Sequence, residues 1–156
     1  MTRETLMRRA IALSHEKMLA GEGGPFGAVI ARDGTIVAEG WNQVTSTLDP
    51  TAHAEMVAIR RACQALGRFD LAGCEVYTSC EPCPMCLAAL YWARVDRIWF
   101  GNARGDAAQI GFDDDFLYRE IPKALQARSI PTQSLLAEEA RAAFDAWRDK
   151  NDKVPY

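Results

Sequence analysis

The chain has 156 residues, a length typical of one domain, and an ordinary globular composition with 49% hydrophobic and 25% charged residues. Its formal net charge of −3 argues against a nucleic-acid partner, because proteins that hold RNA or DNA usually carry a basic face. No stretch approaches the ~18 consecutive apolar residues of a membrane span, so a membrane-spanning protein is also excluded.

Residues 1–21 predict an amphipathic helix rather than a secretory signal. Thr2 can cap this helix, and Leu6, Ala10 and Leu13 fall on one face of it. Acidic residues interrupt the apolar core that a signal peptide needs. Five cysteines is an odd count that does not suit a disulfide framework. We therefore expect a cytoplasmic protein.

The middle of the chain predicts strands that alternate with helices. A β-hairpin is expected at 26–42, because two β-rich runs flank the favoured turn Asp33-Gly34. The strand–helix–strand order that follows favours parallel pairing through a right-handed crossover, with helices on both faces of one mixed sheet. The predicted fold is therefore an α/β protein, a three-layer α/β/α sandwich. The expected elements after the hairpin are a helix at 52–67, a strand at 74–79, a helix at 82–94 and a strand at 97–101.

The last third of the chain is predicted to contain a loop, two helices and an edge strand. Residues 102–116 are polar and contain glycine, which is typical of a functional loop. We expect a short helix at 116–125 that Pro122 breaks, an edge strand at 129–135, and an amphipathic helix at 136–150. No linker or internal repeat divides the sequence, so residues 1–156 are predicted to form one domain.

A Cys-x-x-Cys pair marks the start of the helix predicted at 82–94. Cys83 and Cys86 lie about 60° apart around the helix axis, and the free amide groups of a helix start favour thiolates. Pro82 suits the first helical position, and Pro84 is tolerated one step later. Taken alone, the pair fits either a thioredoxin-like redox pair or a metal site. A structural zinc site would need a second ligand pair, which Cys63, Cys74 and Cys80 supply only at irregular spacing.

His53 and Glu55 lie at the start of another predicted helix, about 30 residues before the cysteine pair. One imidazole and two thiolates leave the fourth position of a zinc ion open for water, which is typical of a catalytic site. Zinc lowers the pKa of that water, and a nearby carboxylate is then needed to move protons. Glu55 is the candidate. The combination H-x-E followed by P-C-x-x-C is the signature of zinc-dependent base deaminases.

Four stretches carry a resemblance to a known family: "GGPFGAVI", "DPTAHAEM", "YTSCEPCPMCLAALYWAR" and "GFDDDF". With them, the chain resembles the cytidine-deaminase-like superfamily, and within it is similar to the short bacterial guanine deaminases. The match runs over nearly the whole chain and is most specific at 23–115. The resemblance implies a cytidine deaminase-like fold, one Zn²⁺ per subunit held by His53, Cys83 and Cys86, and Glu55 as proton shuttle. The implied substrate is a small purine base, converted from guanine to xanthine and ammonia.

The resemblance also implies residues that contact the base. Asn42 is expected to read its edge, since one amide can donate and accept, and Phe26 is expected to lie against its ring. By residue type alone, Asn42 equally suits a turn and Phe26 a core position. The backbone amide of Ala54 can steady charge on the base, and Asp114 is expected to help deliver a proton to the departing amino group. Asp113 and Asp115, the neighbours of Asp114 in the acidic run, suit the start of a helix, where the dipole favours negative charge.

The C-terminal segment is expected to take part in a homodimer. In the enzymes that the chain resembles, this segment, here about 136–156, is exchanged between subunits and closes the partner's pocket. That resemblance places Tyr156 over the substrate. The alternative expectation is a terminal tail that frays, as most chain ends do.

Other functions remain open from the sequence. A tRNA adenosine deaminase shares the zinc motif, although the acidic charge and the phrase "TSCEPCPMC" argue against it. Deamination of another amino-heterocycle, such as a triazine or cytosine, is a further alternative. A zinc or redox module without catalysis is the alternative from another class.

Overall fold

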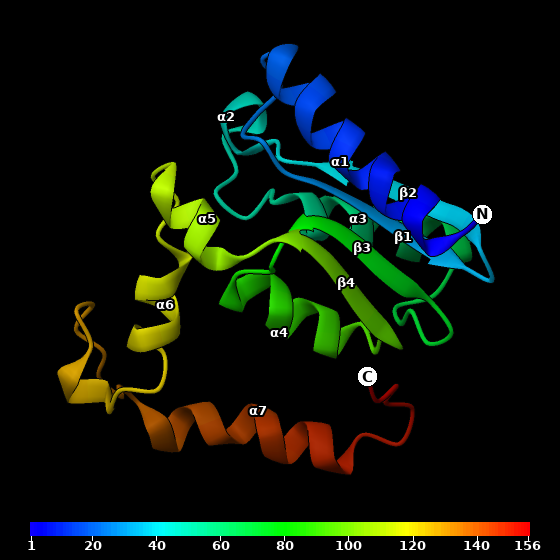
Figure 1. The fold of residues 1–156 in the computed structure, drawn as a ribbon. Helices are drawn as coiled ribbons and strands as arrows, with labels where there is room; N and C mark the ends of the chain where they lie inside the picture. The colour runs from blue at the N-terminus through cyan, green and yellow to red at the C-terminus, as the bar shows by residue number, and fades with distance from the viewer. The chain divides into compact units, whose positions relative to one another are not determined.

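A computed structural model describes all residues 1–156, and the chain divides into two compact units, Met1–Tyr118 and Arg119–Tyr156. The division lies before the segment 136–156 for which exchange between subunits is predicted. Figure 1 shows the course of the chain. The first unit contains α1 (Arg3–Leu19), β1 (Gly27–Arg32), β2 (Thr35–Trp41), α2 (Val44–Thr47), α3 (Ala54–Leu66), β3 (Glu75–Cys80), α4 (Pro84–Trp92), β4 (Arg97–Asn102), α5 (Arg104–Gln109) and the beginning of α6 (Asp114–Glu120).

The four strands form one mixed sheet in the order β2-β1-β3-β4. β1 pairs antiparallel with both β2 and β3, whereas β3 and β4 are parallel and connected by α4. The hairpin turn is Asp33-Gly34, as predicted, with φ angles of 49° and 74°. Both residues thus adopt the left-handed conformation that a tight hairpin turn requires. The mixed sheet and its parallel crossover agree with the sequence.

Helices cover both faces of this sheet (Figure 1). On one face, α1 packs Leu6, Ala10 and Leu13 against Val29 and Tyr77. On the other face, α3 and α4 pack against the alternate residues of β1 and β3. Because successive side chains of a strand point to opposite faces, β1, which is buried except for Arg32, can serve both cores. The predicted three-layer α/β/α fold is therefore confirmed.

The helices that follow the loops at 48–53 and 81–83 begin at residues with metal-binding side chains. His53 is the N-cap of α3, and Gly67 ends that helix at φ 64°, as expected. Cys83 is the N-cap of α4, so Pro84 rather than Pro82 occupies the first helical position. The helix thus begins at Pro84 and not at Pro82, so the prediction for the two prolines was wrong. Proline at the first helical position loses no hydrogen bond, which explains why α4 starts there.

Two predictions for the last third of the sequence were wrong. The expected loop at 102–116 contains the short helix α5, stabilised where the backbone N–H of Ala103 donates to the Asp106 carboxylate at 2.9 Å. Six residues are too few to show a helical period, which is why the pattern was missed. The expected edge strand at 129–135 is irregular, in keeping with the missing amide donor of Pro131.

The second unit consists of the end of α6, a single 3₁₀ turn (Leu125–Ala127) and α7 (Ala137–Asp149). Glu120 organises its first loop, because its carboxylate accepts hydrogen bonds from the Lys123 ammonium group and the Ser129 backbone amide. The predicted amphipathic helix at 136–150 is confirmed as α7, and none of its side chains is buried. No helix of the chain is long and apolar enough to cross a bilayer.

Candidate active site

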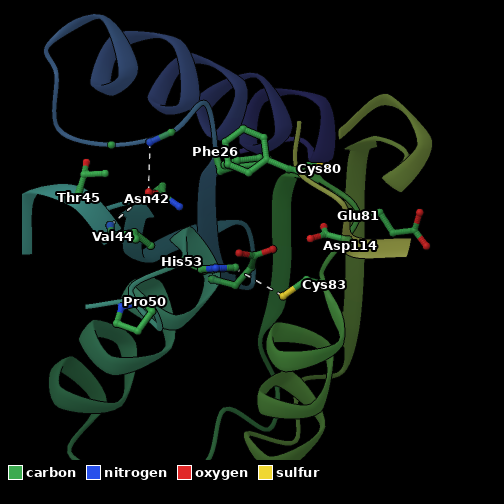
Figure 2. Close-up of a pocket in the computed structure, with 14 residues that line it drawn as sticks. Phe26, Asn42, Val44, Thr45, Pro50, His53, Cys80, Glu81, Cys83 and Asp114 are labelled. Carbon is green, nitrogen blue, oxygen red and sulfur yellow. Dashed lines mark hydrogen bonds between the residues drawn. The ribbon is translucent and has the colours of Figure 1, made fainter. Parts of the chain in front are cut away.

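Three candidate metal ligands meet where α3 and α4 begin. The Nδ1 atom of His53 lies 3.6 Å from the Cys83 Sγ and 3.5 Å from the Cys86 Sγ, and the three ligand atoms lie within 4.8 Å of one another. In a tetrahedral zinc site, with Zn–N of about 2.0 Å and Zn–S of about 2.3 Å, a nitrogen and a sulfur ligand lie roughly 3.5 Å apart. The donor set and its spacing therefore fit zinc. Figure 2 shows His53 directed at Cys83.

The charge of this cluster also suits a cation. Hydrogen bonds from the Cys86 thiol, and then from His53, lower the pKa of Cys83 to about 4. The hydrogen bond to the Cys83 thiolate, together with burial, raises the pKa of Cys86. The same thiolate raises the pKa of His53 by accepting a hydrogen bond from it. Cys83 lies at the N-terminus of α4, where the free amides favour an anion.

Glu55 lies beside the metal-ligand cluster, in the first turn of α3. Its side chain is only 6% exposed, and the Thr78 hydroxyl donates to its Oε1 at 3.3 Å. Burial raises the pKa of Glu55, so its carboxylate is a better proton acceptor than one in water. Thr78 was not predicted from the sequence, because a buried threonine in a strand is an ordinary core residue.

A pocket of about 440 Å³ opens in front of the cluster and is lined by His53, Glu55 and Cys83. A cavity of this size suits a small ligand. Cys80 also lines the pocket, and burial raises its pKa to about 11, so it faces the pocket as a neutral thiol. Cys63 and Cys74 lie elsewhere, in the core on the α3–α4 side.

Asn42 lies in the pocket wall directly after β2 and is 7% exposed. Its Oδ1 accepts hydrogen bonds from the backbone amides of Gly24 and Val44, each at 3.2 Å, as the dashed lines in Figure 2 show. The expectation that this amide both donates to and accepts from a base is therefore wrong in part. Because the oxygen already binds two backbone amides, the Asn42 side chain offers a ligand its two N–H donors.

Two aromatic rings form another part of the wall. Phe26, which precedes β1, meets Phe112 edge to face, with ring centroids 4.8 Å apart and planes at 88°. Both residues line the pocket, and Phe26 also packs against the core on the α3–α4 side. The two sequence interpretations of Phe26, core and pocket wall, thus both apply. Phe112 was missed, since it lies in a segment interpreted as a polar loop.

Asp114 begins α6 and lines the same pocket as the metal ligands. Burial, and then the nearby Cys83 thiolate, raise the pKa of this carboxyl. Its neighbour Asp113 has a local role, because its Oδ1 accepts a hydrogen bond from the backbone amide of Phe116 at 3.0 Å. Asp113 therefore caps the helix, and Asp114 is the acid of this run that faces the pocket.

Two further predicted contact residues lie in different parts of the chain. Ala54 is fully buried between His53 and Glu55 at the first position of α3, where a backbone amide has no partner within the helix. Tyr156 belongs to the second unit, and its side chain is 73% exposed. Its expected place over a substrate remains a prediction.

Comparison with known proteins agrees with this geometry. Residues 1–102 match the cytidine and deoxycytidylate deaminase zinc-binding region. The chain belongs to this deaminase family. It is 51% identical to a guanine deaminase of Bacillus subtilis, over the full length of both chains. The crystal structure of guanine deaminase from that organism matches with a TM-score of 0.97, at 51% identity, and covers 100% of this chain and 99% of the other.

A second group of relatives is less similar to this chain, and one of them, a tRNA-specific adenosine deaminase of Haemophilus influenzae, is 36% identical over 152 residues, which is 94% of this chain and 83% of the other protein. A tRNA-specific adenosine deaminase of Agrobacterium fabrum is 43% identical over 89 residues, which is 56% of this chain and 59% of the other protein. The family resemblance in the sequence is thus confirmed. The candidate zinc ligands His53, Cys83 and Cys86 form one cluster, and His53 and Cys83 line the same pocket as Glu55.

Proposed function

We infer that this chain is a guanine deaminase, a zinc-dependent hydrolase that converts guanine and water to xanthine and ammonia. The observation that carries this inference is the pocket in which the His53–Cys83–Cys86 cluster, Glu55 and the donor side of Asn42 converge. The full-length identity of 51% to the B. subtilis guanine deaminase supports the same reaction.

The reaction replaces an amino group on an aromatic ring by oxygen, which requires an activated water and a group that moves protons. Zinc, when bound by His53, Cys83 and Cys86, makes water a nucleophile at neutral pH. Glu55 accepts the proton that water releases as its oxygen bonds to C2 of guanine, and returns it to a ring nitrogen. The buried position of this carboxylate raises its basicity for the first transfer. The Thr78 hydroxyl holds the carboxylate in place.

The departing amino group needs a second proton before it leaves as ammonia. Asp114 lies in the same pocket, and its raised pKa increases the fraction that is protonated near neutrality. We propose that Asp114 assists this transfer, because C2 of guanine lies between two ring nitrogens and the amine is a poor leaving group. The amide of Ala54 is proposed to stabilise charge that develops on the ring.

Asn42 supports guanine over adenine as the base. Its oxygen is committed to Gly24 and Val44, so its NH₂ group can only donate to a ligand. Guanine presents two acceptors, O6 and N7, along one edge, whereas adenine presents an N6 donor beside N7. An N–H donor directed at that N6 donor would leave both groups unpaired, which is costly in a buried site. We propose that Phe26 and Phe112, which meet edge to face, also contact the ring of the purine base.

We also propose that the enzyme acts as a cytoplasmic homodimer in which the C-terminal segment contacts a second copy. The observation behind this proposal is α7, which exposes Phe144 and Trp147 on a helix with no buried side chain. Exposed apolar surface of this kind usually marks an interaction site. Light scattering of the purified chain tests the dimer, and a monomer at micromolar concentration would contradict it.

An ammonia-release assay over guanine, adenine, cytosine, a triazine and a tRNA anticodon stem tests the proposed function. We expect turnover of guanine and loss of at least about 10³ in rate for Glu55→Gln, with zinc content unchanged. Glu16→Gln, on the exposed side of α1, is the matched control. Turnover of the tRNA stem but not of guanine would instead support the adenosine deaminase function, for which the A. fabrum match is the supporting observation.

A further inference from the structure

A tyrosine outside the pocket connects the end of the first unit to the metal-ligand loop. The Tyr118 hydroxyl donates to the carbonyl oxygen of Pro82 at 2.7 Å. Pro82 is buried and directly precedes Cys83, the N-cap of α4. The hydrogen bond therefore ties α6 to the backbone that carries a candidate zinc ligand.

The ring of Tyr118 is held by a second set of contacts. The Arg104 guanidinium lies over it at 4.5 Å from the ring centroid, and the Arg104 backbone amide donates to Glu81 Oε2 at 2.9 Å. Glu81 is the residue before Pro82. The beginning of α5, the ring of Tyr118 and the loop 81–83 thus form one connected cluster, in which the side chains of Arg104 and Tyr118 are half-buried.

Asp114 lies on the same helix, four residues before Tyr118. Residues four apart occupy the same face of an α-helix, so the face that contacts the metal-ligand loop through Tyr118 also carries the pocket-facing Asp114. A helix of seven residues is too short to be stable by itself, and its position depends on tertiary contacts. The backbone carbonyl of Pro82 supplies such a contact one turn from the acid.

We propose that Tyr118 is a positioning residue for the deamination: its hydrogen bond to Pro82 holds Asp114 at the distance from the zinc-ligand loop that proton delivery requires. The inference rests on the proposed function, in which Asp114 serves as the second acid. Tyr118 itself does not line the pocket and acts through Asp114. An acid displaced by a fraction of an ångström transfers protons more slowly, although substrate still binds.

Tyr118→Phe tests the proposal, because it removes the hydroxyl and keeps the ring beneath Arg104. We expect kcat for guanine to fall about tenfold, with KM within about twofold of the wild type. Zinc per subunit and thermal unfolding are measured on the same samples. Tyr91→Phe is the matched control, since Tyr91 is 76% exposed on α4, and it should leave kcat unchanged. Loss of zinc from Tyr118→Phe would overturn the proposal in favour of a role in holding the metal loop.

The double variant with Asp114→Asn separates a positioning role from a general structural one. If Tyr118 acts through Asp114, Tyr118→Phe changes the residual rate of Asp114→Asn by less than about twofold. The same tenfold loss in both backgrounds would overturn the proposal. Failure of the wild type to deaminate guanine would contradict the proposed function, whereas normal turnover by Tyr118→Phe would contradict only the positioning role.

Discussion

Phe26 and Phe112 come from segments more than eighty residues apart and meet edge to face in the pocket wall, with ring centroids separated by 4.8 Å. Phe26 is anchored from both sides. Its backbone carbonyl accepts a hydrogen bond from the backbone N–H of Asn42, and the backbone N–H of the next residue, Gly27, donates to the Ser79 hydroxyl. Phe112 lies two residues before Asp114. The aromatic contact therefore connects the rigid sheet to the segment that carries the second acid.

Phe112→Ala should weaken substrate binding more than chemistry. An aromatic pair contributes about 1 kcal/mol beyond its buried area, so we expect KM for guanine to rise about fivefold. The change in kcat should be smaller, because neither ring moves a proton. Steady-state kinetics measure both constants. Phe69→Ala, at an exposed position away from the pocket, is the control, and an equal rise in KM for that variant would contradict the assignment.

Gly23→Ala should disturb Asn42. A Cβ atom at Gly23 would lie 1.9 Å from the Asn42 carbonyl oxygen and 2.8 Å from its Oδ1, so the backbone must shift. We expect at least a tenfold rise in KM for guanine, since the donors of Asn42 lose their alignment. Gly105→Ala provides the comparison, because a Cβ there meets no atom within 4 Å. If Gly23→Ala binds guanine normally, Asn42 does not read the base.

The C-terminal segment can be tested by mixing two inactive proteins. One carries Glu55→Gln, and the other lacks residues 153–156, which removes Tyr156. In an exchanged homodimer, the intact tail of the first protein would close the functional pocket of the second. Co-refolding should then restore roughly a quarter of wild-type activity, because about half of the dimers are mixed and each has one complete site. Full activity of the truncated protein alone would remove Tyr156 from the site.

The ion pair between α1 and β2 predicts how stability depends on pH. Arg9 donates to both carboxylate oxygens of Glu39, at 2.7 and 2.9 Å, and this hydrogen bonding lowers the pKa of Glu39 from 4.5. Arg61 and Lys17 add weaker attraction. A carboxyl whose folded pKa is depressed stabilises the protein above its unfolded pKa, and this stabilisation disappears as pH falls through the folded pKa.

Arg9→Gln should therefore reduce the free energy of unfolding at pH 7 by about 1 kcal/mol, since the pair is partly exposed. The difference from the wild type should shrink as pH falls below about 4.5. Urea unfolding at several pH values measures it. Arg8→Gln is the control on the exposed side of α1. A difference that stays constant down to pH 3 would show that Glu39 is not the group involved.

Much of the fold could be predicted from local patterns. The turn at Asp33-Gly34, the stop at Gly67 and the cap at Thr2 are each determined by the chemistry of a few neighbouring residues. The parallel crossover followed from the order of the elements. The short α5 and the irregular course of 129–135 could not be predicted, because six residues show no helical period and a single proline is enough to prevent strand pairing.

The candidate site, like the fold, could be predicted from the sequence only in part. His53, Glu55, Cys83 and Cys86 were identified from the sequence, because each pair lies within one helical turn and the chemistry of zinc specifies the residue types. Thr78, Phe112 and Tyr118 were missed, since a threonine in a strand, a phenylalanine in a loop and a tyrosine in a short helix carry no local signal of a role. Their importance arises from contacts between segments distant in the chain.

By itself, the sequence indicated the deaminase family and predicted the candidate metal ligands and the candidate proton shuttle, because these depend on spacing along two helix starts. Only the tertiary structure decided what Asn42 offers a ligand. Its oxygen is bound by the amides of Gly24 and Val44, and the first of these lies eighteen residues away in sequence. A side-chain amide has both donors and acceptors, and which of them remains available depends on the neighbours that the fold brings to it.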